Sequence, residues 1–443
     1  MGRTKKAKRQ KLSNQESNDG EDSIITNVEE DFIALDADDK RSRQEKRREI
    51  RIGNKRKRKE ESSDSEPTLS EESLIVYPWM ERMNSIQLPA TMSASAFFQN
   101  EVSCFVQYME PSKAEIRMRE YLIHKVRQVI KSYAPQAQIE VFGSFKTGLY
   151  LPNSDIDIVV NAPVGVRLQL RKIASALERY DVCDFATVIE RASVPVIKFE
   201  DSLTQLKVDI ILDSKTGLAS AEIIKTMMRH QPGLRELTLI IKHFLAIRKL
   251  NEVFTGGLGG YAIVCLVMSF LQMHPKVASG EIDPEKHLGA LLVEFLHLYG
   301  INFELGRVGI CVKNGGSYFD VDRFVSRNGR PVFSIRDPQD YDNDIGCKSY
   351  SASTVCRSFR RAYLTLTSKS SALAEELEYR SRKGRDVRNY LKKTSLLKSI
   401  LHVPLDIINQ RDLIEDVYEE RRWHDEPVSE TFAWTAEEKE RRI

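Results

Sequence analysis

The sequence lacks paired cysteines. Its six cysteines are scattered over 443 residues, and none belongs to a Cys-x-x-Cys motif. Zinc sites and thiol-redox sites commonly use that motif, so the sequence predicts neither kind of site. We interpret the six as reduced thiols, which favours an intracellular protein.

Long apolar runs are missing as well. The apolar segment over residues 261–271 is shorter than the ~18 residues of a membrane span, and Ser269 interrupts it. The first residues of the chain lack the apolar core of a secretory signal. We therefore expect a protein that makes no membrane contact.

The sequence also lacks recognisable RNA-binding modules. The sequence contains no zinc knuckle and no aromatic motif of the RNP type. If the protein acts on RNA, its affinity has to come from basic surface, from its termini or from a partner.

Basic residues are concentrated near the start of the chain. The net charge is only +3, yet residues 40–59 hold 12 Lys or Arg and 2 Glu, a local charge of about +10. Residues 1–73 cannot bury enough apolar area to offset their ordering entropy, so we expect them to be disordered. The compact run over residues 55–59 favours a nuclear import signal or an RNA contact.

The rest of the chain divides by its apolar pattern into α/β and mainly helical segments. We expect an α/β plus α fold with a cleft between the two parts. The expected limits are 112–230 for the α/β domain, 77–111 and 231–378 for a helical central domain, and 379–443 for a charged tail. The expected strands are 138–142, 155–160, 184–190, 194–199 and 205–212, and the expected helices are 112–133, 167–177, 219–228, 234–250, 261–273 and 287–299.

Two aspartates at the start of one strand form the strongest chemical signal. Asp155 and Asp157 open an apolar, β-branched run, and residues i and i+2 of a strand share a face. Two adjacent carboxylates are costly unless a cation lies between them, and a divalent metal ion suits oxygen ligands. The pattern therefore predicts a metal site on this strand.

A third aspartate completes the expected site. Asp209 lies on the polar face of the strand expected over 205–212. If that strand pairs beside the strand of Asp155 and Asp157, three carboxylates converge. Three acidic side chains are typical of sites that hold two Mg²⁺ (or Mn²⁺) ions for phosphoryl or nucleotidyl transfer. We predict that these three aspartates are the catalytic and metal-binding residues.

A Gly-Ser pair upstream fits the binding of phosphate. Gly143 and Ser144 form a turn between an expected strand and a helix, where backbone N–H groups are available to phosphate oxygens. Gly-Ser turns are common, so the pair is weak by itself. Followed by Asp155-x-Asp157 and by a third strand aspartate, it indicates a site for a nucleoside triphosphate.

These motifs resemble those of a known family. Gly143-Ser144 followed by Leu-Pro-Asn-Ser-Asp-Ile-Asp over residues 151–157 is similar to the polymerase-β-like nucleotidyltransferases. Later motifs narrow the resemblance to the nuclear poly(A) RNA polymerases of the TRAMP complex. These motifs are P-G-L-R-E-L at 232–237, I-I-K at 240–242, T-G-G-L-G-G-Y at 255–261, H-P at 274–275, L-G at 288–289, D-P at 337–338 and N-D-I-G at 343–346.

The resemblance implies an ATP site beyond the Gly-Ser turn. It implies that Lys242 contacts the triphosphate, that Tyr261 stacks on the base, and that Gly217 lies against the ribose. It also implies that Asn343 reads the base edge, and the absence of the His that uridylyl-adding relatives use in this loop favours ATP. Gly260 is expected to line the site but departs from the family, because relatives often place a Ser there.

The resemblance also implies an activity and partners. The expected reaction is the template-independent addition of AMP from ATP to RNA 3′ ends. The expected partners are a zinc-knuckle RNA-binding protein and an RNA helicase that pass tailed RNA to the nuclear exosome, and the expected location is the nucleus or nucleolus. Two alternatives remain open, namely an RNA uridylyltransferase or mixed-nucleotide tailing enzyme, and an inactive scaffold subunit of an RNA-processing complex.

Overall fold

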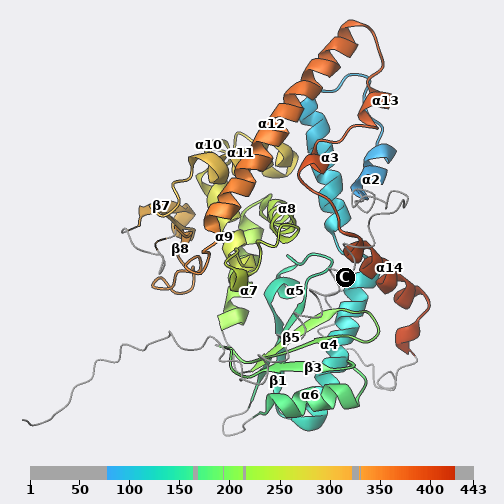
Figure 1. Cartoon of the computed structure of the whole chain (residues 1–443), viewed down its shortest axis with the longest axis vertical. Helices are drawn as coiled ribbons and strands as arrows, with labels where there is room; N and C mark the ends of the chain where they lie inside the picture. Colours follow the sequence, from blue (N-terminus) through green and yellow to red (C-terminus); the bar gives the residue numbers. More distant parts are fainter. Residues whose placement is uncertain are drawn as a thin grey trace, which may run out of the picture. The chain divides into compact units, whose positions relative to one another are not determined.

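The computed structural model describes residues 77–424 except 163–167, 193, 213–215, 322–328 and 330. The segment 1–73, for which we predict disorder, lies outside the described residues. The described chain has two large apolar cores, one in an α/β part and one in a helical part (Figure 1), and a small third cluster of Leu149, Ile224 and Val264. None of the helices in this part of the chain combines the length and the hydropathy that crossing a bilayer requires.

The α/β part is built on a five-stranded sheet. The strand order is β1-β2-β5-β4-β3, with β2 and β5 parallel and the other neighbours antiparallel. All five predicted strands are present, with ends shifted by two residues or fewer. They are β1 (Gln138–Phe142), β2 (Ile156–Asn161), β3 (Ala186–Ile189), β4 (Val196–Glu200) and β5 (Lys207–Leu212).

Two helices cover one face of this sheet. Ile156 and Ile158 of β2 are fully buried in one core with the apolar residues of these helices. Because side chains alternate along a strand, Asp157 between them projects from the opposite face, which the two helices leave open. The covering helices are α4 (Lys113–Tyr133) and α6 (Leu170–Arg179).

The start of α4 follows the predicted capping box. The Ser112 side chain accepts a hydrogen bond from the Glu115 N–H, and the Glu115 carboxylate accepts one from the Ser112 N–H. Two of the free N–H groups at the helix start are thereby satisfied, which fixes where α4 begins.

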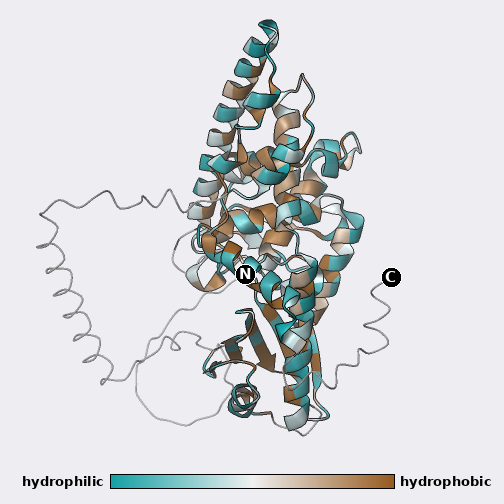
Figure 2. Ribbon diagram, turned by 90° about the vertical axis from the view of Figure 1, so that its right-hand side faces the viewer, coloured by the Kyte–Doolittle hydropathy of each residue, from teal (hydrophilic) through white to brown (hydrophobic). Residues whose placement is uncertain are grey.

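The helical part encloses a second core that is rich in leucine and phenylalanine. In Figure 2 the apolar colour concentrates where these helices meet, whereas the far end of the longest helix, α12, is largely hydrophilic. A small sheet in the order β7-β6-β8 adjoins this core. The remaining elements are α2 (Trp79–Ser85), α3 (Ala94–Met109), α5 (Gly143–Thr147), α7 (Thr216–His230), α8 (Leu234–Ala246), α9 (Gly260–Met273), α10 (Pro275–Ala278), α11 (Leu288–His297), β6 (Val308–Cys311), β7 (Ser317–Asp320), β8 (Ser334–Ile335), α12 (Ala352–Arg382), α13 (Arg388–Leu391) and α14 (Leu405–Glu419).

The predicted charged tail over 379–443 is wrong for its described residues. The chain continues through α12, α13 and α14, and Leu391 and Val403 are fully buried in the helical core. Farther along, Ile414 and Val417 are fully buried in the core of the α/β part. The high charge of this segment concealed its sparse apolar residues, of which Leu391, Val403, Ile414 and Val417 are fully buried.

One buried carboxylate ties this C-terminal segment to α3. Glu101 is fully buried, and it accepts hydrogen bonds from the Ser395 hydroxyl and from the N–H groups of Leu396 and Leu397 at 2.9 and 3.1 Å. The Trp79 indole N–H donates to it at 3.4 Å. Burial raises the pKa of Glu101, and these donors oppose that shift.

We predict that Glu101→Ala destabilises the protein by about 3 kcal/mol, because buried N–H and O–H donors lose their acceptor. Urea unfolding followed by circular dichroism measures this change. The matched control is Glu281→Ala, which removes an exposed ion pair with Lys276 and should change the free energy of unfolding by about 0.5 kcal/mol or less. Equal stability of the two variants would contradict the prediction.

Candidate active site

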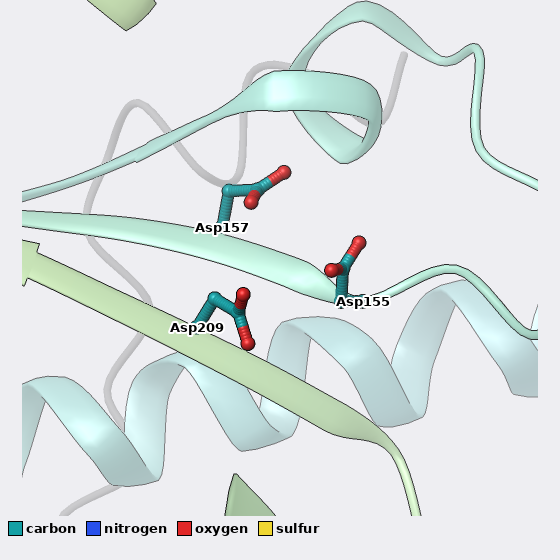
Figure 3. Close-up of side chains that lie close together, drawn as sticks. All are labelled: Asp155, Asp157 and Asp209. Atoms are coloured by element: carbon teal, nitrogen blue, oxygen red, sulfur yellow. The ribbon is translucent and has the colours of Figure 1, made fainter. Parts of the chain in front are cut away.

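The parallel pairing of β2 with β5 brings the three predicted aspartates together. The register places Asp157 beside Asp209, and Asp155 directly precedes β2. One carboxylate oxygen from each of the three residues lies within 4.8 Å of the others. Figure 3 shows the three side chains clustered at the ends of β2 and β5, with the short helix α5 beside Asp157. The predicted convergence of the three carboxylates is therefore present.

The electrostatics of this cluster favour the binding of a cation. Burial, followed by the charges of Asp155 and Asp209, raises the pKa of Asp157 to about 7, although Lys242 and Lys198 oppose the shift. Burial also raises the pKa of Asp209, despite its ion pair with Lys198. The nearby lysines thus do not offset the combined effect of burial and neighbouring negative charge on these carboxylates. Carboxylate oxygens are the ligands that Mg²⁺ and Mn²⁺ prefer, so this donor set fits the predicted divalent ions.

A cavity of about 660 Å³ opens beside the cluster. Asp209 does not line it but lines a neighbouring hollow of about 450 Å³, which Asp155 also lines. Asn343 lines neither of the two. The predicted residues on the wall of the larger cavity are Gly143, Ser144, Asp155, Asp157, Gly217, Lys242, Gly260 and Tyr261.

At two of these positions only glycine fits, because a Cβ would collide with a neighbouring side chain. Gly143 begins α5 with a φ of +63°, and a Cβ there would collide with the Asp157 carboxylate. A Cβ on Gly217 would lie 2.6 Å from the Phe142 ring. At Gly260, in contrast, the nearest atom to a Cβ would be the Lys242 Nζ at 3.8 Å, so a side chain has room.

Lys242 supplies a partly buried cation to the cavity wall. It belongs to α8, and its ammonium donates a hydrogen bond to the Leu149 carbonyl at 2.5 Å. Burial lowers the pKa of Lys242 to about 8, while the charges of Asp155 and Asp157 act in the opposite direction. A partly buried ammonium that lines a cavity favours an anionic occupant, because an anion offsets the loss of hydration.

Asn343 is connected to the cavity through Tyr261. The Tyr261 hydroxyl donates to Asp337 at 3.1 Å, and the Asn343 amide nitrogen donates to the other oxygen of Asp337 at 2.9 Å. Asp337 is buried. The contact of Asn343 with a base stays a prediction, and in this structure the amide helps to orient the tyrosine.

Two residues that position the site were not found from the sequence. Arg119 of α4 is buried and donates to the carbonyls of Pro152 at 2.5 Å and Ser154 at 2.8 Å, which fixes the loop before Asp155. Lys198 of β4 pairs with Asp209 across the sheet. The signal for Arg119 was its place on the apolar face of α4, where a charge requires buried partners.

Two protein families match parts of the chain. A family described as "Poly(A) RNA polymerase, mitochondrial-like, central palm domain" matches residues 98–229. The family "Cid1 family poly A polymerase" matches residues 287–343. The first match contains the three aspartates, and the second reaches Asn343.

Curated relatives match a larger share of the chain. Poly(A) RNA polymerase cid14 of Schizosaccharomyces pombe is 37% identical over 353 residues, which is 78% of this chain and 51% of that protein. Poly(A) RNA polymerase protein 2 of Saccharomyces cerevisiae is 34% identical over 80% of this chain and 62% of its own length. This chain thus spans about half the length of the fungal relatives that it matches.

A shorter relative is covered more completely. Trf4-2 of Drosophila melanogaster, which is named an inactive poly(A) RNA polymerase protein, is 32% identical over 72% of this chain and 76% of that protein. The family therefore contains at least one member that is named as inactive.

The fold also matches solved structures. The polymerase core of TRAMP, described as an RNA surveillance complex, is 34% identical with a TM-score of 0.61, and the match covers 72% of this chain and all of that one. The Cid1 poly(U) polymerase bound to MgATP shares the fold at 20% identity and a TM-score of 0.52 over 62% of this chain and 95% of that one. The resemblance predicted from the motifs is confirmed at the level of the family, and the chain belongs to the poly(A) RNA polymerases related to the polymerase of TRAMP.

Proposed function

We propose that this protein adds AMP from ATP to the 3′ ends of RNA without a template. The observation that carries the proposal is that Lys242 lines one cavity together with Asp155 and Asp157, which cluster with Asp209. A triphosphate that enters this cavity meets an ammonium on one side and a site for divalent ions on the other. The match to poly(A) RNA polymerases supports the same reaction.

The chain's own side chains divide the work of this reaction. Asp155, Asp157 and Asp209 hold the divalent ions, which when bound would lower the pKa of the RNA 3′-hydroxyl and stabilise the departing pyrophosphate. Asp209 accepts the hydroxyl proton. The 3′-oxygen then forms a bond to the α-phosphorus of ATP, and the bond from that phosphorus to the pyrophosphate oxygen breaks.

The rest of the cavity binds the nucleotide in this proposal. Lys242 contacts the triphosphate, and Gly143 and Ser144 offer backbone N–H groups to it. The Tyr261 ring stacks on the base, with its hydroxyl fixed on Asp337.

An RNA substrate is supported by a basic face on α12. Arg357, Arg360, Arg361 and Lys369 line an exposed hollow of about 590 Å³. No acidic residue occurs in α12 before Glu375, and none of the four cations has an acidic partner within the described part of the chain. Uncompensated cations in a row favour a polyanion such as RNA.

Two alternative functions have to be distinguished from this one. The first is an RNA uridylyltransferase or mixed-nucleotide tailing enzyme. Its test is to offer each NTP singly to the purified protein with a labelled oligo(A) primer. The second is the role of an inactive scaffold, which the existence of the inactive relative Trf4-2 keeps open. The complete aspartate cluster supports the enzyme over the scaffold.

We also propose that the protein works in the nucleus within a complex like TRAMP. Its partners in this proposal are a zinc-knuckle RNA-binding protein and an RNA helicase, and the nuclear exosome receives the tailed RNA. The 34% identity to the polymerase core of TRAMP supports the proposal. Co-purification of the tagged chain from nuclei, followed by mass spectrometry, tests it.

Replacement of both Asp155 and Asp157 by Asn should reduce extension of an oligo(A) primer by at least roughly a hundredfold, because the charges that hold the divalent ions are lost. Gel analysis of a labelled primer with ATP measures the extension. The control is Asp181→Asn, at an exposed aspartate with a φ of +50° that asparagine tolerates. Full activity of the double variant would exclude the proposed mechanism.

Binding of the ions can be measured apart from activity. MgCl₂ should raise the thermal unfolding midpoint of the wild type, because bound cations offset the crowding of the three carboxylates. It should not do so for the variant with Asp155→Asn and Asp157→Asn, whose midpoint without metal should already exceed that of the wild type. NaCl at matched ionic strength is the control for screening. An equal response of both proteins to MgCl₂ would argue against a metal site here.

Two glycines of the cavity should respond in opposite ways to a side chain. Gly260→Ser should lower the KM for ATP by roughly 2- to 10-fold, because a hydroxyl has room there and can add a hydrogen bond to the nucleotide. Gly143→Ala should abolish activity, because its Cβ displaces the Asp157 carboxylate. Steady-state kinetics with ATP as the varied substrate give both results. A weaker affinity for ATP in Gly260→Ser would show that this assignment is wrong.

A further inference from the structure

The aspartate cluster continues across the open face of the sheet as a row of polar side chains. The registers place Asp157 beside Asp209, Asp209 beside Lys198, and Lys198 beside Thr187. Because neighbouring strands lie about 4.8 Å apart, this row extends about 14 Å from the cluster to the edge strand β3. The row leads away from the nucleotide cavity.

A second hollow lies along this row. It has a volume of about 450 Å³, and its wall includes Asp155 and Asp209 from the cluster. Beyond the cluster the wall includes Lys198, Lys207 and Thr187, and also two acidic residues, Asp184 and Glu200, the second of which lies 3.9 Å from the Lys207 ammonium. Asp155 and Lys207 also line the nucleotide cavity. The two spaces therefore meet at the carboxylates, with the cluster between them.

An exposed aromatic ring completes the wall of the second hollow. Phe185 lines it and is 70% exposed, although phenylalanine is a residue that usually seeks burial. Both neighbours of Phe185 are hydrogen-bonded, because the Ala186 N–H donates to the Glu178 carboxylate at 2.8 Å and the Asp184 side chain accepts from the Ser202 hydroxyl at 3.2 Å. Phe185 presents its ring to solvent next to the site.

The chemistry of the reaction assigns an occupant to this hollow. In an in-line transfer the attacking oxygen and the leaving group lie on opposite sides of the phosphorus. If the triphosphate occupies the cavity beside Lys242, the attacking 3′-hydroxyl approaches from the side of Asp209, which is the side of the second hollow. The RNA whose 3′ end carries this hydroxyl then lies over Lys198, Lys207 and Phe185.

We propose that this second hollow binds the last nucleotides of the acceptor RNA, with the Phe185 ring stacked on a base and Lys198 and Lys207 facing the phosphates. The inference rests on the function proposed above and assigns its acceptor site. A base of any identity can stack on a phenyl ring, which suits an enzyme that extends RNA of varied sequence. Phe185 is then a residue that binds the acceptor and makes no contact with ATP.

The test compares Phe185→Ala with the wild type under single-turnover conditions. The concentration of oligo(A) primer at half-maximal rate should rise by roughly 5- to 150-fold, the range of base–aromatic stacking, whereas the KM for ATP should not change. Phe185→Trp should retain the affinity for the primer. The matched control is Tyr180→Ala, which removes a 49% exposed aromatic ring of the same domain that lines neither space.

Primers with one abasic nucleotide separate stacking from a general loss of structure. Two primers are compared, one abasic at the last nucleotide and one at the penultimate nucleotide. With the wild type, one of them should bind more weakly than the intact primer by the same factor that Phe185→Ala causes. Phe185→Ala should not distinguish that primer from the intact one. Equal primer affinity of Phe185→Ala and the wild type would overturn the inference, as would an abasic effect that persists in the variant.

Fluorescence anisotropy of a labelled primer measures RNA binding without extension, so it can distinguish failure of the acceptor site from failure of the proposed function. If the wild type binds RNA through Phe185 but does not extend it, the proposed function fails and the acceptor site stands. If the wild type extends the primer and Phe185→Ala does so with equal affinity, the function stands and the acceptor site fails. If the wild type neither binds nor extends the primer, both fail.

Discussion

Three carboxylates are held closer together than their charges favour, and much of the α/β part serves to hold them there. The parallel pairing of β2 with β5 sets Asp157 beside Asp209, and the buried Ile156 and Ile158 anchor the strand from the other face. Arg119 fixes the loop that leads into Asp155. Burial, followed by the charges of Asp155 and Asp209, raises the pKa of Asp157, which shows the cost of this arrangement. A fold retains such a cost where a function requires the charges, which is why the cluster indicates chemistry rather than stability.

Much of this arrangement follows from the sequence because its signals are local. The alternation of apolar residues after Asp155 specifies both a strand and the face on which its aspartates lie. The residues that position the site depend instead on tertiary contacts that no spacing specifies. Lys198 meets Asp209 only because β4 pairs with β5, and the partners of Arg119 are carbonyl groups, which every residue carries. The C-terminal helices were missed for a similar reason, because their few apolar residues have two different cores as partners.

The nucleotide cavity is assembled from both parts of the chain, so its geometry depends on how they are joined. Lys242 on α8 reaches the Leu149 carbonyl, and Gln339 of the loop after β8 donates to Ser220 on α7. The C-terminal segment adds a third connection. Arg411 of α14 donates to the Tyr108 carbonyl at 2.8 Å at the end of α3, and also pairs with Glu115 at the start of α4 at 3.1 Å. This segment acts as a strap across both cores rather than as a solvated tail.

The two sides of the aspartate cluster differ in construction, and the difference bears on specificity. The side of Lys242 is lined by residues from both parts of the chain and has a tyrosine oriented by a buried aspartate, which suits selection of one base. The side of Phe185 is lined by the α/β part alone, and the Phe185 ring is 70% exposed. Under the proposed function, a platform with one exposed ring accepts RNA of any sequence but holds it weakly. The proposed enzyme would then select its nucleotide itself and rely on additional surface, on the chain or on a partner, to select its RNA.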